Sequence, residues 1–185
     1  SNSLIWVESI AARLGVSITP AEVGFGPAPN RRKCPVALSI PALAESCTGY
    51  AQGGSRVTAP DGIGNPNGNG INGASPAPMT VPMVTQVADH LAAFTSFGSD
   101  DIVFVFGGNN DVFYQAGAVG QGLPVDQAQA NIVTAATELA TLVRSEIIAK
   151  GGKRVAVMTL PDSASTPYGS TLSADGRALL TGLSA

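Results

Sequence analysis

Two glycine-rich turns hold the groups of this chain that could take part in catalysis. The first is Tyr50-Ala-Gln-Gly-Gly-Ser55 and the second is Gly107-Gly-Asn-Asn-Asp111, and each follows a strand-like stretch. Backbone N–H groups at such turns, with an Asn amide nearby, can form an oxyanion hole, which binds the charge that develops when an ester carbonyl is attacked. The alternative is that both are ordinary tight turns at strand ends, with Asn110 and Asp111 bonded to backbone.

The segment before the second turn is a continuous apolar run, Ile102-Val-Phe-Val-Phe106. A run of this kind predicts a strand over residues 101–106 that is buried on both faces of a parallel sheet. The residues after its carboxyl end then lie where open α/β sheets bind their ligands. No Gly-Lys-Ser/Thr follows either turn, and the glycine spacing does not fit a dinucleotide site, so we expect no nucleotide cofactor.

The remaining elements alternate between helices and strands, which favours an α/β fold with a parallel sheet covered by helices. Apolar spacing and terminal Pro or Gly residues predict helices over 6–14, 82–94, 127–150 and 173–183, and further strands over 48–52 and 154–160. Two Gly/Pro-rich stretches, 24–41 and 60–82, are expected to be long surface loops. We expect one domain over residues 1–185.

Composition and charge exclude several classes of protein. Hydrophobic residues make up 44% and charged residues 12%, which argues against a disordered chain. The formal net charge is −3 and the only basic cluster is Arg31-Arg32-Lys33, so we expect no nucleic-acid partner. No run of about 18 apolar residues is present, so we expect no transmembrane segment.

Cys34 and Cys47 are the two cysteines of the chain. In a reducing compartment they would be two thiols, and in a secreted protein they would form one disulfide that adds about 3 kcal/mol. The polar, lysine-poor composition favours export to the periplasm, the cell surface or the medium. One histidine and two distant cysteines have no metal-ligand spacing, so we expect no metal site.

The two turns, in this order, resemble two blocks of the SGNH (GDSL-type) esterase/lipase family of secreted bacterial enzymes. Gly108-Asn-Asn-Asp111 is similar to the Gly-x-Asn-Asp block, and Gly49-Tyr-Ala-Gln-Gly-Gly-Ser55 is similar to the Asn-Tyr-Ala-x-Gly-Gly-Ala block. Other similar segments are Arg56-Val57, Pro78-Met-Thr-Val-Pro-Met83, Thr159-Leu-Pro161 and Thr166-Pro-Tyr-Gly169. The resemblance covers essentially the whole chain and implies a flavodoxin-like, three-layer α/β/α fold with a parallel sheet.

The resemblance also implies roles for individual residues. Asn110 would be the side-chain donor of the oxyanion hole and Gly54 the backbone donor, with Gly53 as the alternative register. Gly108 and Asp111 would support the second turn rather than act on the substrate. The implied substrate is a small acyl ester or a lipid. Gly49 departs from the usual Asn of the block.

The family's nucleophile and base blocks are not found. The sole Asp-Ser pair, Asp162-Ser163, follows the wrong strand, and the sole histidine, His90, lies in a predicted helix. We expect His90 to be a half-exposed surface residue. In this family the nucleophile strand lies between the strands of the two glycine turns. We therefore expect this chain to be part of a longer enzyme, inactive alone, whose missing flanks lie outside this sequence or on a separate chain.

Two alternatives remain open. The first is a non-catalytic carbohydrate- or lipid-binding module on the same scaffold, with residues 62–73 as a recognition loop. The second is a flavodoxin-like cofactor binder, which would want a Ser/Thr-rich phosphate loop after the first strand, and none is present.

Overall fold

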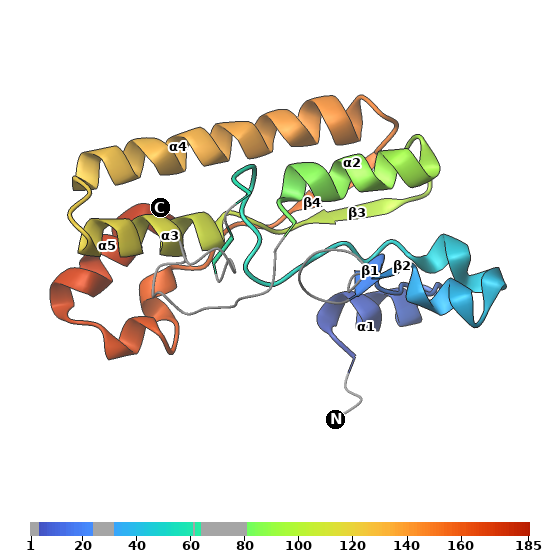
Figure 1. The fold of residues 1–185 in the computed structure, drawn as a ribbon, viewed down its shortest axis with the longest axis horizontal. Coiled ribbons are helices and arrows are strands. Elements are labelled where there is room, and N and C mark those ends of the chain that lie inside the picture. The colour runs from blue at the N-terminus through green and yellow to red at the C-terminus, as the bar shows by residue number, and fades with distance from the viewer. Residues whose placement is uncertain (1–3, 24–31, 61, 64–80) are drawn as a thin grey trace. The chain divides into compact units, whose positions relative to one another are not determined.

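The computed structural model describes residues 4–23, 32–60, 62–63 and 81–185. The chain divides into two compact units, Ser1–Ala51 and Gln52–Ala185, and each is described by itself (Figure 1). The expectation of a single domain over 1–185 concerns how the two units assemble and stays a prediction.

The described residues of the first unit form one α-helix, a pair of short antiparallel strands and two 3-10 helices. Helix α1 is Trp6–Arg13, as predicted to within one residue, and its Glu8 carboxylate accepts from the Ile5 N–H at 2.9 Å. Strands β1 (Glu22–Val23) and β2 (Arg32–Lys33) pair antiparallel. The 3-10 helices are Pro35–Leu38 and Pro41–Ser46, and each begins with a proline, whose fixed φ suits a helix start.

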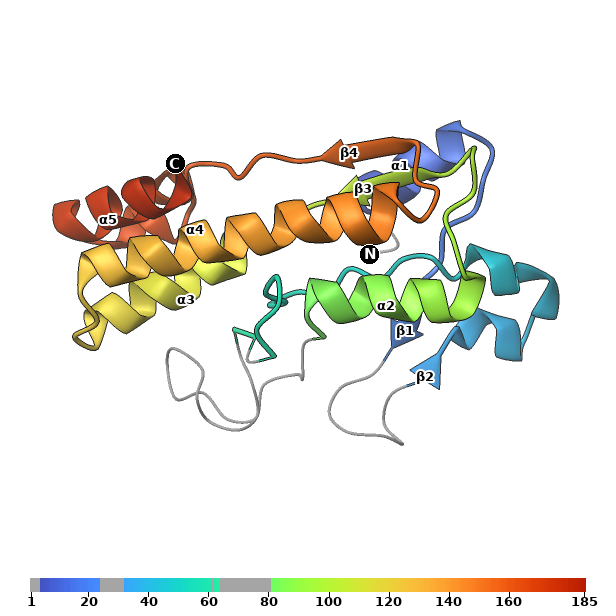
Figure 2. The ribbon, with the colours of Figure 1, turned by 90° about the horizontal axis from the view of Figure 1, so that it is seen from above.

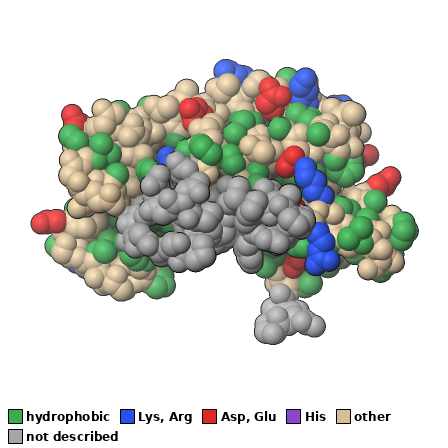
Figure 3. Space-filling view, in the orientation of Figure 1, with side chains coloured by type: hydrophobic (Ala, Val, Ile, Leu, Met, Phe, Trp, Pro, Cys, Tyr) green, Lys and Arg blue, Asp and Glu red, His purple; other side chains and the backbone are tan. Residues whose placement is uncertain are grey.

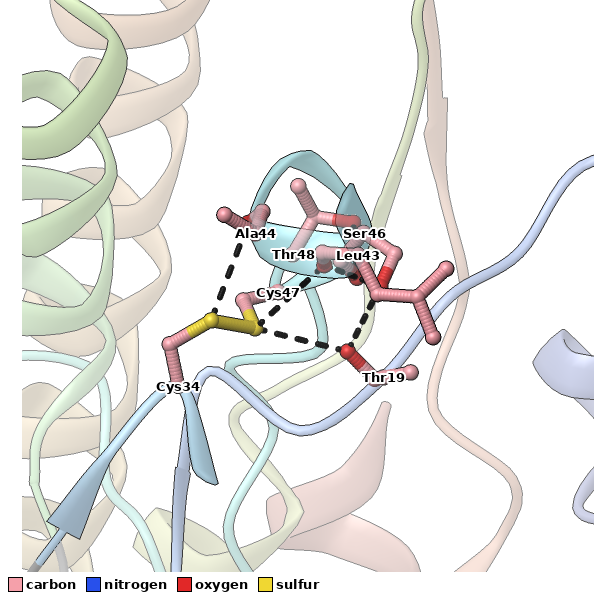
Figure 4. The surroundings of a disulfide bond; sticks show 7 residues. All are labelled: Thr19, Cys34, Leu43, Ala44, Ser46, Cys47 and Thr48. Atoms are coloured by element: carbon pink, nitrogen blue, oxygen red, sulfur yellow. Dashed lines mark hydrogen bonds between the residues drawn. A yellow bond between two sulfur atoms is a disulfide. The ribbon is translucent and has the colours of Figure 1, made fainter. Parts of the chain in front are cut away.

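A disulfide between Cys34 and Cys47 closes this part of the first unit (Figure 4). The end of the second 3-10 helix is also bonded to the segment before β1. Thr19 N–H donates to the Ser46 carbonyl at 2.7 Å, and the hydroxyls of the same two residues lie 2.9 Å apart. The disulfide therefore reinforces a contact that hydrogen bonds already define.

The second unit is built on a two-stranded parallel sheet. Strands β3 (Ile102–Val105) and β4 (Arg154–Val157) pair with Ile102 opposite Arg154 and Val105 opposite Val157. Helix α2 (Met83–Phe94) and the long helix α4 (Val125–Leu142), which continues as a π-helix over Val143–Ile148, cover one face of this sheet (Figures 1 and 2). The core between these layers is Phe97, Val105, Val143 and Ile147.

A second core lies where three helices meet. Helix α3 (Asn109–Gly120) and helix α5 (Ala174–Ser184) pack with α4 around Val112, Ala128, Leu180 and Leu183. The Ser173 hydroxyl caps α5 by accepting from the Gly176 N–H at 3.2 Å. Helix α3 follows β3 after only three residues, so the two cores are joined directly through the second glycine turn.

The expectation that the strand over 101–106 is buried on both faces is wrong. The exposed fractions are 44% for Ile102, 48% for Phe106 and 53% for Val157, whereas Val105 is buried. An apolar run reports residue type, but burial also needs a second layer, and the described residues of the second unit supply a layer on one face only. The α/β class holds, while the three-layer arrangement remains a proposal.

Other boundaries and elements also differ from expectation. The strand predicted over 48–52 does not form; only a single parallel bridge joins Gly49 to Pro20. A lasting strand needs a hydrogen-bonded partner, and the turn at Gly53-Gly54 follows at once. The predicted loops over 24–41 and 60–82 lie partly outside the described residues, and within the described part residues 32–38 are strand and 3-10 helix rather than loop.

The surface combines few charges with many exposed apolar side chains. Figure 3 shows hydrophobic side chains lying among scattered charged ones on the face that it draws. In the described part of the chain, no helix is both long and apolar enough to cross a bilayer.

Candidate oxyanion site

The two glycine turns singled out in the sequence lie against one another in the second unit. The Asn110 amide donates from Nδ2 to the backbone carbonyl of Ser55 at 2.7 Å, across 55 residues of sequence. Ser55 follows Gly54 directly, so this bond places the Asn110 amide beside the glycine turn. The structure thus brings Asn110 to the residue that follows Gly54, the predicted backbone donor.

Asp111 makes the second connection between the turns. Its Oδ1 lies 2.9 Å from Arg56 Nε, and its Oδ2 accepts from the Val57 N–H at 3.1 Å. The side chains of Asp111 and Arg56 are 4% and 12% exposed. Asp111 also lies in the first turn of α3, where the positive end of the helix dipole favours a carboxylate. One carboxylate therefore joins the helix start to the two residues that follow the other turn.

Residues 52–58, which we call the glycine-block segment, are also bonded to α2. The N–H groups of Met83 and Val84, at the start of the helix, donate to the carbonyls of Arg56 at 3.0 Å and Val57 at 3.1 Å. These are donors that have no partner within a helix. The segment therefore caps α2, and α2 in turn fixes the path of the segment.

Side chains add further bonds to the glycine-block segment. Gln52 Oε1 accepts from the Val81 N–H at 3.0 Å, and the Ser55 hydroxyl donates to the Val81 carbonyl at 2.8 Å. Gln86 donates to the Ser55 hydroxyl at 3.2 Å, and Thr58 donates to Glu138 of α4. Bonds from α2, α3 and α4 thus hold one short segment, which is the rigidity that an oxyanion hole needs.

Gly54 has a positive φ, the backbone conformation that favours glycine, and Gly53 does not. Gly54 has φ +86°, and its carbonyl accepts from the Ile63 N–H at 3.0 Å, while no described residue accepts from its own N–H. A side chain at Gly53 would meet nothing within 4 Å. Asn110 Nδ2 carries two hydrogens, and the Ser55 carbonyl takes one of them. Among the described residues, the Gly54 N–H and the second N–H of Asn110 therefore have no acceptor.

Gly107 and Gly108 let the chain pass from β3 straight into α3. Gly108 has φ +100° and precedes the first helical residue, and a Cβ at Gly107 would overlap the thioether of Met83. As a result Asn110 lies in the first turn of a helix and not in a loop. The sequence reasoning did not predict α3, because Asn, Asp and Gly are poor helix formers. The apolar spacing of Val112, Ala116 and Val119 was the available signal.

The Asp162-Ser163 pair has a structural role. Ser163 is fully buried, and its hydroxyl donates to Asn109 Oδ1 at 2.8 Å. Asp162 caps the 3-10 helix Ser163–Ser165 by accepting from the Ala164 N–H at 3.0 Å. Ser163 therefore cannot reach a substrate as it stands, and it instead fixes the residue next to Asn110.

The expectation that His90 is a surface residue is wrong. It is 8% exposed, and its ring stacks on Phe97 at 4.3 Å between centroids and lies 5.0 Å from Phe94. Burial lowers the pKa of His90, while a backbone hydrogen bond at Ser96 and the charge of Asp101 oppose that shift. The spacing of Val87, His90, Leu91 and Phe94 places the ring on the apolar face of α2, and this spacing was the signal that the sequence reasoning overlooked.

Arg56 and Tyr114 are the residues near the site to which sequence reasoning assigned no role. The Arg56 guanidinium lies over the Tyr114 ring, 4.0 Å from its centroid.

Across the described ranges, no three His, Cys, Asp or Glu side chains gather as metal ligands. Comparisons of the chain with protein-family models, with curated proteins and with solved structures find no match.

Proposed function

We propose that this chain is the oxyanion-hole portion of a serine esterase or lipase of the SGNH type. The observation that carries the proposal is the Asn110–Ser55 hydrogen bond, which joins the side-chain amide to the residue that follows Gly54. The proposed substrates are small acyl esters or lipids. The nucleophilic serine and the histidine base lie outside these 185 residues, in flanks of the same enzyme that are part of the same chain or of a separate one.

In the proposed reaction the serine oxygen attacks the ester carbonyl carbon while the histidine removes the serine proton. The carbonyl oxygen then becomes an oxyanion, which accepts hydrogen bonds from the Gly54 N–H and from the second N–H of Asn110. The start of α3 adds a positive potential at the same place. Collapse of the intermediate expels the alcohol, protonated by the histidine, and water then releases the acyl group from the serine.

The open side of the sheet supports the proposed three-layer fold. Among the described residues β3 pairs only with β4, and Ile102 and Phe106 are exposed. An unpaired strand edge beside exposed apolar side chains is unfavourable in a finished fold. A further parallel strand along β3, carrying the nucleophile, would pair this edge, and a second helical layer would cover the exposed side chains. The Cys34–Cys47 disulfide supports a secreted, periplasmic or cell-surface location.

The test is hydrolysis of p-nitrophenyl esters by the enzyme that contains this chain together with its flanks. We expect Asn110→Ala to lower kcat about 10²–10³-fold with little change in KM, because the lost donor acts on the transition state. The matched control is Asn131→Ala, the same change on α4 at a side chain that bonds to Gln115 and not to either turn, and it should leave kcat near that of the wild type. Equal kcat for Asn110→Ala and wild type would remove Asn110 from this role.

A second candidate is a non-catalytic carbohydrate- or lipid-binding module. The observation that favours it is that Ser163 and His90 are both buried, so neither can act as an accessible nucleophile or base. Labelling of the natural protein with a fluorophosphonate separates the two functions. An activated serine reacts with this probe, whereas a binding module leaves it unreacted.

A further inference from the structure

Two neighbouring residues of α3 are bonded to three consecutive residues of the glycine-block segment. Asn110 bonds to Ser55, and Asp111 bonds to Arg56 and to the Val57 N–H. The Asn110 contact is a single hydrogen bond from a neutral amide. The Asp111 contact is charge-assisted, divided over two carboxylate oxygens and almost fully buried, and such bonds are the stronger kind.

We propose that Arg56 is a positioning residue for the oxyanion hole. It holds Asp111, and through Asp111 it keeps the start of α3 aligned with the glycine-block segment, so that the Asn110 amide stays beside Gly54. This inference rests on the proposed function. Arg56 does not touch the substrate; its effect reaches the reaction only through the placement of Asn110.

The contacts of Arg56 require an arginine and not simply a positive charge. Its Nε bonds to Asp111 Oδ1 at 2.9 Å while the guanidinium plane lies 4.0 Å over the centroid of the Tyr114 ring. Tyr114 lies on α3, three residues after Asp111. A guanidinium can donate in its plane and stack with its face at the same time, whereas an ammonium group cannot. Arg56 is therefore fixed by two contacts on one helix.

A comparison of Arg56→Lys, Asn110→Ala and the double variant tests the inference through p-nitrophenyl ester hydrolysis by the enzyme with its flanks. We expect Arg56→Lys to lower kcat about ten- to a hundredfold with KM nearly unchanged, since a small misplacement of a catalytic group has a cost of this size. In the Asn110→Ala background the same change should lower kcat no further, because the misplaced group is already gone. Tyr114→Phe keeps the ring and should retain the kcat of the wild type.

A second measurement does not depend on catalysis. The two side-chain N–H resonances of Asn110 in NMR spectra should be distinct and slow to exchange in the wild type, and should broaden or merge in Arg56→Lys. If Arg56→Lys does not fold, Tyr114→Leu replaces it, because this change removes only the ring beneath the guanidinium.

The outcomes separate the inference from the proposed function. An unchanged kcat in Asn110→Ala overturns the proposed function, whatever the Asn110 resonances of Arg56→Lys show. A lowered kcat in Asn110→Ala with an unchanged kcat in Arg56→Lys overturns only the role of Arg56. Losses that multiply in the double variant also overturn that role, because they mean that Arg56 acts independently of Asn110.

Discussion

The Asn110 side-chain amide donates to the Ser55 carbonyl at 2.7 Å and so joins the start of α3 to a segment 55 residues earlier in the chain. Both partners are polar groups of turns, and neither turn could hold this geometry alone. The bond is accompanied by the Asp111 contacts to Arg56 and Val57. The candidate oxyanion site is therefore a product of long-range packing, and its stability should respond to small changes at Asn110.

Asn110→Asp should destabilise the second unit although the change is nearly isosteric. It replaces the donor with a carboxylate oxygen close to the Ser55 carbonyl, which leaves that carbonyl unsatisfied at a cost of about 1–3 kcal/mol. The helix start favours an acidic residue by only about 0.3–1 kcal/mol, so the net effect is a loss. Urea unfolding at pH 7 measures it, with Asn110→Ala as the uncharged variant that loses the same hydrogen bond. An Asp variant as stable as the wild type would show that the bond to Ser55 contributes little.

Gly151→Ala should be much more destabilising than Gly122→Ala. The two glycines have nearly the same backbone conformation, with φ +107° and +104°, so both variants carry a similar strain of about 1 kcal/mol or more. A side chain at Gly122 meets nothing within 4 Å, whereas a side chain at Gly151 overlaps the backbone carbonyl of Phe97. Such overlap adds about 1–3 kcal/mol. The difference in the free energy of unfolding isolates this steric part, and equal losses would contradict it.

The sequence was sufficient for the elements whose signal is local. Helix α2 begins after Pro82, where the proline indicated a helix start, and α5 begins within one residue of its predicted start. The parallel pairing of β3 and β4 also followed from the alternation of helices and strands. Helix α4 was predicted two residues too short at its start, because Pro124 sets that boundary and the apolar face begins later.

The parts that could not be predicted depend on contacts between distant residues. The Arg56–Asp111 pair has no local signature, since each residue alone is an ordinary surface type. The exposure of Ile102 and Phe106 depends on which layers are present, and residue type does not report this. His90 differs, because its place on the apolar face of α2 could be read from the spacing of its neighbours. The polarity of the residue outweighed that pattern in the prediction.

The stability of the second unit should fall as the pH drops below 6.5, and His90 should account for the fall. Burial lowers the pKa of His90 from its ordinary value of 6.5. Just below pH 6.5 the unfolded chain therefore binds a proton at His90 that the folded chain does not bind. The contribution is complete above pH 6.5 and is lost as the pH falls toward the folded pKa, by at most about 1.4 kcal/mol per pH unit. The nearby Asp101 charge reduces the effect without reversing it.

Urea unfolding of wild type and His90→Phe between pH 7.5 and 5 measures this contribution. His90 is the sole histidine, and no other side-chain type has an ordinary pKa in this range. The wild type should lose stability more steeply than the variant, whose ring can still stack on Phe97. Parallel curves for the two proteins would rule out a titrating His90 as the cause.

Reduction of the Cys34–Cys47 disulfide should loosen the first unit at the contact that the disulfide reinforces. The bridge closes a short loop, with a sequence separation of 13. Without it the unfolded state gains chain entropy, which lowers the free energy of unfolding by about 3 kcal/mol. Hydrogen exchange at the Thr19 amide, which donates to Ser46 at 2.7 Å, reports on this contact. We expect exchange there to accelerate on reduction and to be equally fast in a Cys34→Ser/Cys47→Ser variant, which reductant should not affect further. Slow exchange at Thr19 in the double-serine variant would mean that the hydrogen bonds between Thr19 and Ser46 hold the segment without the disulfide.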